Sequence, residues 1–275
     1  MNEKELTHID LFSGIGGFSL AGEWAGFRTI VFCEKDEFCQ KVLQKRFGAI
    51  IADTESMGRR NGVAENKGKK PRKINPFSNQ APLLIPEIRD FDGTKWRSAT
   101  LLTGGFPCQP FSVAGPRTGK EDDRYLWPEM LRIIKEARPR WVLAENVPGI
   151  FRMALDTVLA DLENEGYATG TFIIPACGLN APHRRNRAWI IANSINDRMR
   201  RGNHGDSRGS KCTLQIKRPI QRADWEKDWH EVAARFCRVD DGISDRVYRL
   251  KALGNAIVPQ VAYEILKNIA WIEKG

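Results

Sequence analysis

The stretch LLTGGFPCQPFS, residues 101–112, contains the pattern that decides the fold. The short apolar run from Ala99 to Leu102 predicts a buried strand, which we expect the following glycine pair to end. Cys108 therefore stands where a strand gives way to a loop, with a proline on either side. Each proline fixes its own φ and restricts the residue before it, so the backbone around the thiol is stiff. This local pattern fits an aimed nucleophile and a buried structural cysteine about equally well.

A second stretch, WVLAENVPG at residues 141–149, has the same design. An apolar strand ends in Glu145 and Asn146 and is closed by proline and glycine. In an open parallel sheet, ligands bind beyond the carboxyl ends of the strands. The two stretches therefore predict an α/β fold in which Cys108 and Glu145 project into one crevice. A thiol and a carboxylic acid placed in this way suit covalent addition to an electron-poor ring, with proton donation to that ring.

The N-terminal part of the chain predicts a strand, a glycine-rich turn and a helix. Residues 7–12 form the expected strand, SGIGG at 13–17 the turn, and Phe18 to about Ala25 the helix. Glycines at this point let the backbone approach a ligand at the helix N-terminus, although a plain tight turn has the same appearance. The next expected strand, Thr29 to Cys33, delivers Glu34 at its carboxyl end, where an acid can accept both ribose hydroxyls of a nucleoside.

Taken together, Pro107-Cys108-Gln109 and Glu145-Asn146-Val147 resemble the catalytic pair of the DNA (cytosine-5)-methyltransferases. The resemblance runs from Ile9 to about Ala192 and resumes near Arg249, with several motifs in the family's order. It implies a Rossmann-like, S-adenosylmethionine-dependent methyltransferase sheet with a small target-recognition region. It also implies methyl transfer to carbon 5 of a flipped cytosine in duplex DNA, through a covalent cysteine adduct.

The resemblance implies a set of cofactor-binding residues as well. In the family, the first motif binds S-adenosylmethionine and the acid after the second strand holds its ribose. Glu87 stands near the position of an aspartate that contacts the adenine amino group, and is one methylene longer, with Asp90 close by. Gly254-Asn255 resembles the last motif, which completes the pocket. The predicted cofactor-binding residues are Phe12, Gly14, Ile15, Gly16, Gly17, Glu34, Glu87, Ile88, Pro107, Leu126 and Asn255.

An arginine-rich stretch, HRRNR at residues 183–187, runs directly into a predicted buried strand. The family has Gln-x-Arg-x-Arg here; His183 replaces the glutamine, while Arg185 and Arg187 match the two arginines. The resemblance implies that Arg185 contacts the ring oxygen of cytosine and that Arg187 braces Glu145. With Cys108, these residues make up the predicted catalytic set.

The segment after the thiol is expected to contact DNA. Glycines at 115 and 119, with Arg117 and Lys120 beside them, suit a lid over residues 113–124 that closes on a phosphate backbone, although an ordinary exposed loop is the alternative. A net charge of +9 also fits a polyanionic partner. The predicted DNA-binding residues are Gln109, Ser112, Arg117, Lys120, Arg198 and Arg200.

The sequence further predicts how the chain is divided. Residues 1–192 plus 249–275 form the expected catalytic and cofactor-binding domain, interrupted by an inserted basic loop at 53–81. Within the first of these, Phe151 to Asn164 is expected to form one helix and Tyr167 to Pro175 a strand. Residues 193–248 form the expected target-recognition region. Pro259 begins a last helix, whose predicted buried face consists of Val261, Ala262, Ile265, Ile269 and Ile272.

Composition narrows the class of protein. The 275 residues, 41% of them hydrophobic, can bury a sizeable core, and no apolar run is long enough to span a bilayer. The charged N-terminus carries no signal-peptide pattern, so we expect a cytoplasmic protein. The resemblance implies a bacterial cell as its setting, with the gene carried by the bacterium or by a phage, and we expect a monomer. The six scattered cysteines form no metal-ligand pattern, so reduced thiols and no metal are expected.

Several alternatives stay open from the sequence. A tRNA cytosine-5 methyltransferase resembles the same motifs, and a non-catalytic nucleic-acid-binding relative is conceivable although both Cys108 and Glu145 are present. A nicotinamide-dependent oxidoreductase would explain the glycine turn and Glu34 but leaves the Pro-Cys-Gln and arginine motifs without a task. A restriction-modification pair and the protection of a phage genome are equally compatible settings.

Overall fold

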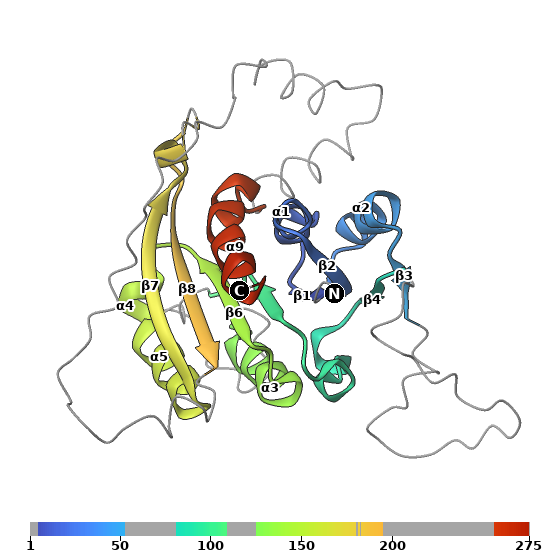
Figure 1. Ribbon diagram of the computed structural model, residues 1–275, viewed down its shortest axis with the longest axis horizontal. Helices are drawn as coiled ribbons and strands as arrows, with labels where there is room; N and C mark the ends of the chain where they lie inside the picture. The colour runs from blue at the N-terminus through green and yellow to red at the C-terminus, as the bar shows by residue number, and fades with distance from the viewer. Residues whose placement is uncertain are drawn as a thin grey trace, which may run out of the picture.

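The computed structural model describes residues 5–52, 81–108, 125–179, 181, 183–194 and 256–274. These residues form one eight-stranded sheet of order β3-β4-β2-β1-β5-β6-β8-β7 (Figure 1). Its neighbouring strands run parallel from β3 to β6, and β8 lies antiparallel to both β6 and β7. The strands are β1 (Leu6–Leu11), β2 (Phe27–Cys33), β3 (Ile50–Ile51), β4 (Leu83–Ile85), β5 (Leu101–Gly104), β6 (Trp141–Asn146), β7 (Tyr167–Pro175) and β8 (Asn186–Ser194).

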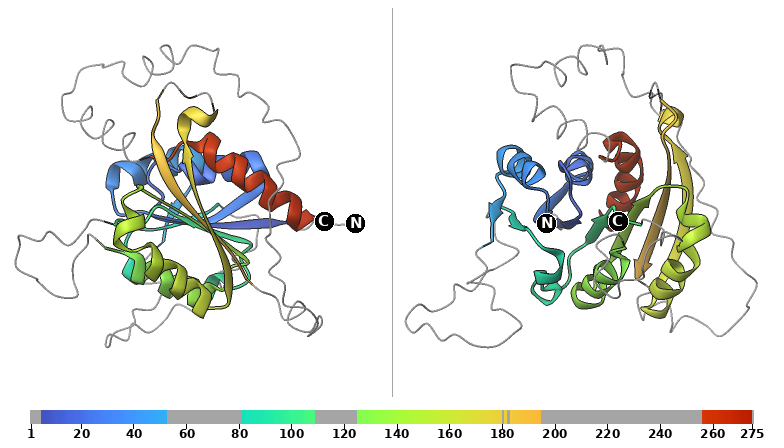
Figure 2. Two further views of the ribbon diagram at one scale, coloured as in Figure 1. Left: turned by 90° about the vertical axis from the view of Figure 1, so that its left-hand side faces the viewer. Right: turned by 180° about the vertical axis from the view of Figure 1, so that it is seen from behind.

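Helices cover both faces of this sheet, which makes three layers. One face carries α1 (Gly17–Ala25), α2 (Glu37–Phe47) and α9 (Pro259–Lys274), and the other carries α3 (Trp127–Ala137), α4 (Ile150–Met153) and α5 (Leu155–Asn164) (Figures 1 and 2). Short 3-10 turns, η1 (Ile88–Asp90), η2 (Gly93–Trp96) and η3 (Ala176–Leu179), join the remaining segments. The arrangement confirms the predicted Rossmann-like α/β class.

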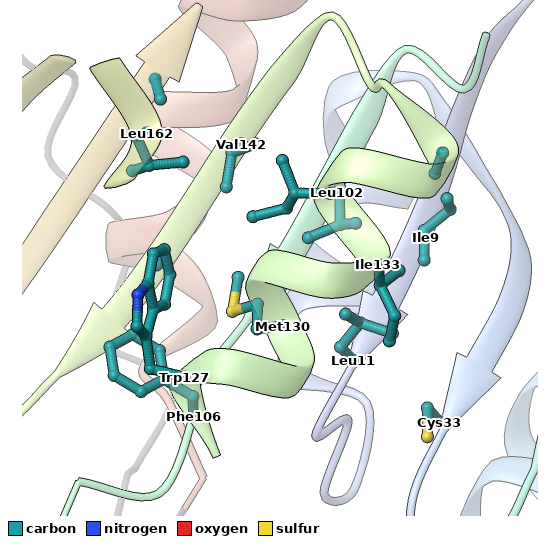
Figure 3. Close-up of a cluster of buried hydrophobic side chains, with 14 of the residues drawn as sticks. Ile9, Leu11, Cys33, Leu102, Phe106, Trp127, Met130, Ile133, Val142 and Leu162 are labelled. Atoms are coloured by element: carbon teal, nitrogen blue, oxygen red, sulfur yellow. The ribbon is translucent and has the colours of Figure 1, made fainter. Parts of the chain in front are cut away.

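The larger core lies between the sheet and α3. Figure 3 shows Met130 and Ile133 of α3 packed over Ile9, Leu11 and other strand side chains of this cluster. Because side chains alternate along a strand, Ile9 and Leu11 face α3, and His8 and Asp10 face α1. The His8 and Asp10 side chains thus point away from this apolar core, toward the helix that follows the glycine turn.

The second core joins the two ends of the chain. Phe18 of α1 and Leu266 of α9 belong to one buried cluster on the opposite face of the sheet. A Cβ added to Gly17 would lie 2.7 Å from Cγ1 of Ile257, so the chain just before α9 touches the start of α1. The last helix therefore belongs to the same layer as the first.

The observed boundaries correct several sequence predictions. Strand β5 continues through Gly104, because that residue still pairs with Leu11 and Ala144, whereas we expected the glycines to end it. The single helix expected over 151–164 is divided at Ala154, whose φ of −151° is not helical. In α9, Ile272 is 44% exposed, while Leu266 and Ala270 are buried instead.

Other predictions fall outside the described residues. They concern most of the basic loop at 53–81, the lid at 113–124, almost all of the target-recognition region at 193–248, and the residues Gln109, Ser112, Arg117, Lys120, Arg198, Arg200 and Asn255. In the part of the chain that is described, no helix is long and apolar enough to cross a membrane.

Candidate active site

The turn between β1 and α1 is tightly shaped and takes an unusual backbone conformation. Phe12, Gly14 and Gly16 have φ values of 53°, 54° and 84°, in the left-handed region that a residue with a side chain adopts only at a cost. A Cβ on Gly16 would lie 2.4 Å from the Phe47 ring, so only glycine fits there. Around a Cβ on Gly14, by contrast, no atom of the described residues lies within 4 Å, so this part of the structure leaves room for a ligand at the turn.

The carboxyl group of Glu34 accepts a hydrogen bond from the backbone of that turn. Its Oε2 accepts the Gly14 N–H at 2.7 Å and its Oε1 accepts the Asp36 N–H at 2.8 Å. Burial raises the pKa of Glu34, and these backbone bonds lower it. Each carboxylate oxygen has a further lone pair, so Glu34 can still accept hydroxyls from a ribose. The structure thus unites two sequence motifs, in an arrangement that fits the predicted nucleoside cofactor.

Glu87 and Ile88 follow β4, which pairs with β2, so they lie at the same edge of the sheet as Glu34. Oε2 of Glu87 lies 3.8 Å from Nζ of Lys35. The side chain of Ile88 is buried in the core beneath the sheet, and its carbonyl accepts from Nη2 of Arg132 at 2.9 Å.

The predicted Asn255 is not described, but the residues after it are. The carbonyl of Ala256 accepts a 2.6 Å hydrogen bond from Nη2 of Arg185, and Ile257 lies against Gly17. This segment is consequently attached both to the start of α1 and to the arginine stretch.

The segment after β5 holds Cys108 through contacts on both sides. The ring of Phe106 lies 5.1 Å from that of Trp127, centroid to centroid, and the N–H of Leu126 donates to the carbonyl of Pro107 at 3.2 Å. Cys108 itself pairs with Tyr125 in an isolated antiparallel bridge. These contacts fix the thiol residue, together with Pro107 and Leu126, at the start of α3.

The thiol of Cys108 is partly buried, and burial raises its pKa. Because the thiolate is the nucleophilic form, the free protein holds Cys108 mostly as the unreactive thiol.

Glu145, at the end of β6, lies beside the same segment. A Cβ added to Gly105 would meet Oε2 of Glu145 at 3.4 Å, which brings the carboxyl group next to the loop that carries Cys108. Nδ2 of Asn146 donates to the carbonyl of Phe106 at 3.0 Å and binds this loop to β6. The sequence therefore predicted correctly that the two stretches meet at one edge of the sheet.

The two arginines have different surroundings. Nε of Arg187 lies 2.8 Å from Oε1 of Glu145, which is the ion pair expected from the sequence. Burial raises the pKa of Glu145, while the charges of Arg187 and Arg185 lower it. Arg185 donates to the Ala256 carbonyl and has a φ of 30°. It therefore links the start of β8 to the chain before α9. Its predicted contact with a cytosine stays a prediction.

Two features of this region were not in the predicted site. Asn146 belongs to the Glu-Asn-Val motif but not to the predicted site residues, although its side chain connects β6 to the segment that carries Cys108. His8 received no role from the sequence, yet it is fully buried and hydrogen-bonded on both ring nitrogens. The available signal was the pair of ionisable residues, His8 and Asp10, within the short strand LTHIDL.

The fold and this edge of the sheet place the chain in the class of Rossmann-like α/β proteins, whose ligands bind beyond the central strands. Two solved structures of this shape are a mutant of Spodoptera frugiperda DNMT2 (TM-score 0.52, 16% identity, covering 79% of this chain and 54% of that chain) and S. pombe Dnmt2 methyltransferase (TM-score 0.51, 19% identity, covering 82% and 67%). At these identities the likeness concerns the fold alone.

Residues 6–231 match the family described as C-5 cytosine-specific DNA methylase, and the chain belongs to that family. It is 30% identical over 196 residues to the Type II methyltransferase M.DsaV of Dactylococcopsis salina, covering 70% of this chain and 46% of that protein. It is 33% identical over 195 residues to M.PspPI of a Psychrobacter species (68% and 39%), and 30% identical over 207 residues to M.AquIA of Picosynechococcus (70% and 73%). The chain thus spans less than half the length of the first two relatives.

Proposed function

We propose that this protein is a DNA (cytosine-5)-methyltransferase that transfers a methyl group from S-adenosylmethionine to carbon 5 of a cytosine in duplex DNA. The observation that carries the proposal is that three groups of residues follow the carboxyl ends of neighbouring strands, at one edge of the sheet. Gly14 with Glu34 follows β1 and β2, the Cys108 segment follows β5, and Glu145 with its Arg187 partner ends β6.

The cofactor would bind over the glycine turn. Glu34 would accept the ribose hydroxyls, and the open space over Gly14 would let the backbone approach the ligand. The segment that begins at Ala256 would close the pocket from the other side. When bound, S-adenosylmethionine supplies a methyl group on a positively charged sulfur.

Cys108 is the nucleophile in this proposal. Carbon 5 of cytosine is a poor nucleophile, and addition of the Cys108 thiolate to carbon 6 makes it electron-rich. Burial raises the pKa of Cys108, so a nearby positive charge or a base has to help produce the thiolate.

Glu145 is the acid that shares a proton with ring nitrogen 3. Burial raises its pKa and so favours the protonated form, and Arg187 holds the carboxyl in position. After carbon 5 has accepted the methyl group, a base removes the proton on that carbon. The bond between carbon 6 and the Cys108 sulfur breaks, and the thiolate and the aromatic ring are restored.

Duplex DNA is the proposed substrate, with the target cytosine turned out of the stack so that both groups can reach it. The net charge of +9 supports a polyanionic partner, and the names of the Type II relatives support a role in restriction-modification. We propose that the protein acts as a monomer and that the predicted domain division holds.

The test is methylation by the purified protein. With S-adenosylmethionine labelled in the methyl group, duplex plasmid DNA should gain label, and bisulfite sequencing should locate it at cytosine carbon 5 in one sequence context. Cys108→Ala should abolish this label while cofactor binding, measured by calorimetry, stays near normal. Label on tRNA and none on DNA would overturn the proposal.

A further inference from the structure

A closed ring of hydrogen bonds lies beneath the candidate site, between the sheet and α1. Its members are five buried side chains from four elements: His8, Asp10, Ser19, Thr29 and Thr103. Four of them are 0% exposed and Thr29 is 8% exposed. No step of the proposed methyl transfer uses them.

The ring can be followed atom by atom. His8 Nδ1 lies 3.0 Å from Thr29 Oγ1, and Thr29 Oγ1 lies 2.9 Å from Ser19 Oγ. Ser19 Oγ lies 2.6 Å from Asp10 Oδ2. Asp10 Oδ1 lies 3.3 Å from Thr103 Oγ1, which is 2.7 Å from His8 Nε2 and closes the ring.

Counting hydrogens constrains the protonation of this ring. Its five hydrogen bonds each need one hydrogen, and the hydroxyls of Ser19, Thr29 and Thr103 supply three. The remaining two must come from His8 and Asp10 together. The ordinary combination at neutral pH, a neutral imidazole with an ionised carboxylate, supplies only one. One contact would then bring two acceptors together, away from water.

Burial decides between the two combinations that supply both hydrogens. One is an imidazolium with a carboxylate, and the other is a neutral imidazole with a neutral carboxylic acid. Burial raises the pKa of Asp10 to about 7 and lowers that of His8 to about 3, because it disfavours charge on either group. The neutral pair is therefore favoured.

Other titratable groups on the packed elements do not reverse this balance. The charge of Glu34, after β2, raises the pKa of Asp10 further. Cys33 of β2 is buried with a raised pKa of its own and brings no positive charge. Arg28 of β2 pairs with Glu5, Glu23 of α1 is exposed, and β5 contains no titratable residue.

The ring connects the two halves of the candidate site. Ser13, in the glycine turn, donates through Oγ to the backbone carbonyl of Asp10 at 2.7 Å. Ser19, whose hydroxyl lies 2.6 Å from the Asp10 carboxyl group, is in the first turn of α1. Thr103 is followed by the end of β5 and the segment that leads to Cys108. A change at the Asp10 carboxyl would therefore be felt both at the cofactor turn and at the thiol.

We propose that Asp10 carries the fifth hydrogen of this ring as a neutral acid at pH 6, and that the closed ring is a positioning device that holds the glycine turn and the Cys108 segment in fixed register. The second part rests on the proposed methyl transfer, since it concerns the alignment of a bound cofactor with an attacked ring. A misplacement of about 1 Å between reacting groups can cost roughly 100-fold in rate.

The protonation state can be measured without any activity. The measurement is NMR at pH 6 on protein labelled with ¹⁵N in histidine and with ¹³C in the aspartate carboxyl groups. The variants His8→Phe and Asp10→Asn assign the two signals. His8 should show one protonated ring nitrogen, and Asp10 should show the carboxyl chemical shift of a neutral acid. An imidazolium, or an ionised Asp10 carboxylate, would overturn the neutral ring.

The positioning role is tested by a matched pair of variants. Thr103→Val keeps the volume but removes the hydroxyl between Asp10 and His8, and Thr103→Ser keeps that hydroxyl. With duplex DNA saturating, kcat should fall at least tenfold in the valine variant and recover to within about threefold in the serine variant, and the Kd for S-adenosylmethionine should change less than threefold in both. Wild-type kcat in Thr103→Val would overturn the positioning role. A wild-type protein inactive on DNA would overturn the proposed function, but the NMR result on the ring would stand.

Discussion

At the scale of single residues, Glu145 is held between two opposing influences. Burial raises the pKa of its carboxyl, whereas Arg187, at 2.8 Å, and the charge of Arg185 lower it. A carboxyl group adjusted in this way suits proton sharing near neutral pH, because the best catalytic acid has a pKa close to the working pH. The chemistry proposed here depends on that adjustment.

Glu145→Gln should retain DNA binding and lose most of the methyl-transfer rate. Glutamine keeps the shape of the side chain but has no acidic proton, so the single-turnover rate should fall by about 10²- to 10⁴-fold. Fluorescence anisotropy with a labelled duplex measures the binding and should show little change. Wild-type turnover in this variant would remove Glu145 from the mechanism.

Arg187→Met should change the pH profile as well as the rate. Without the arginine, the pKa of Glu145 rises further, so the alkaline limb of the kcat profile should move to higher pH. The maximum of kcat should fall at least tenfold because the carboxyl loses its 2.8 Å partner. Arg184→Met, at an exposed neighbouring position, is the control and should keep the wild-type limb. An unshifted limb in Arg187→Met would contradict the assigned role.

At the scale of elements, the glycine turn shows why this site needs its residue types. Gly16 is restricted in two ways, by a φ of 84° and by the Phe47 ring of α2 that lies over it. Gly166 also has a left-handed φ, of 83°, but among the residues that the structure describes a Cβ there would meet no atom within 4 Å. A comparison of the two positions therefore distinguishes the cost of the left-handed backbone, which both share, from the cost of the contact with Phe47, which only Gly16 has.

Gly16→Ala should destabilise the protein more than Gly166→Ala and should weaken cofactor binding. Both changes add about 1–2 kcal/mol of left-handed strain. Only the first also overpacks the contact with Phe47, at a further cost of about 1–3 kcal/mol. Urea denaturation gives the stabilities and calorimetry gives the Kd for S-adenosylmethionine. Equal losses in the two variants would show that Phe47 does not constrain the turn.

The elements differ in how well the sequence predicts them. The bounds of β7, Tyr167–Pro175, were predicted correctly, because Gly166 and the turn after Pro175 mark both ends. The break at Ala154 was not predictable, since the apolar spacing continues through it and only tertiary packing reveals it. The Arg187 pairing was implied by the resemblance, whereas the ring around Asp10 depends on which face of β1 meets α1.

At the scale of the whole molecule, the hydrogen-bonded ring affects how stability depends on pH. With pKa values of about 3 for His8 and about 7 for Asp10, the folded pair is neutral and holds two protons between about pH 4 and 6.5. In the unfolded chain the pair is an imidazolium and a carboxylate, which also holds two. The two contributions to the pH dependence therefore cancel over this range.

Asp10→Asn should make the stability of the protein depend on pH, because the contribution of His8 is then no longer cancelled by that of Asp10. Below pH 6.5 the unfolded His8 binds a proton that the folded one does not, so the variant should lose stability as the pH falls. Relative to the wild type, the slope should be about 1.4 kcal/mol per pH unit. Urea midpoints measured between pH 4.5 and 6.5 give both slopes. Parallel curves for the two proteins would contradict the neutral pair.

The most direct test of the central claim is to trap the covalent adduct on DNA. The protein should be incubated with S-adenosylmethionine and a duplex whose target cytosine carries fluorine at carbon 5. Fluorine cannot leave as a cation, so after addition of Cys108 and transfer of the methyl group the bond from sulfur to carbon 6 should persist. Mass spectrometry should then find the methylated nucleotide on the peptide that contains Cys108. An adduct on another residue, or efficient methylation of ordinary DNA by Cys108→Ala, would contradict the account.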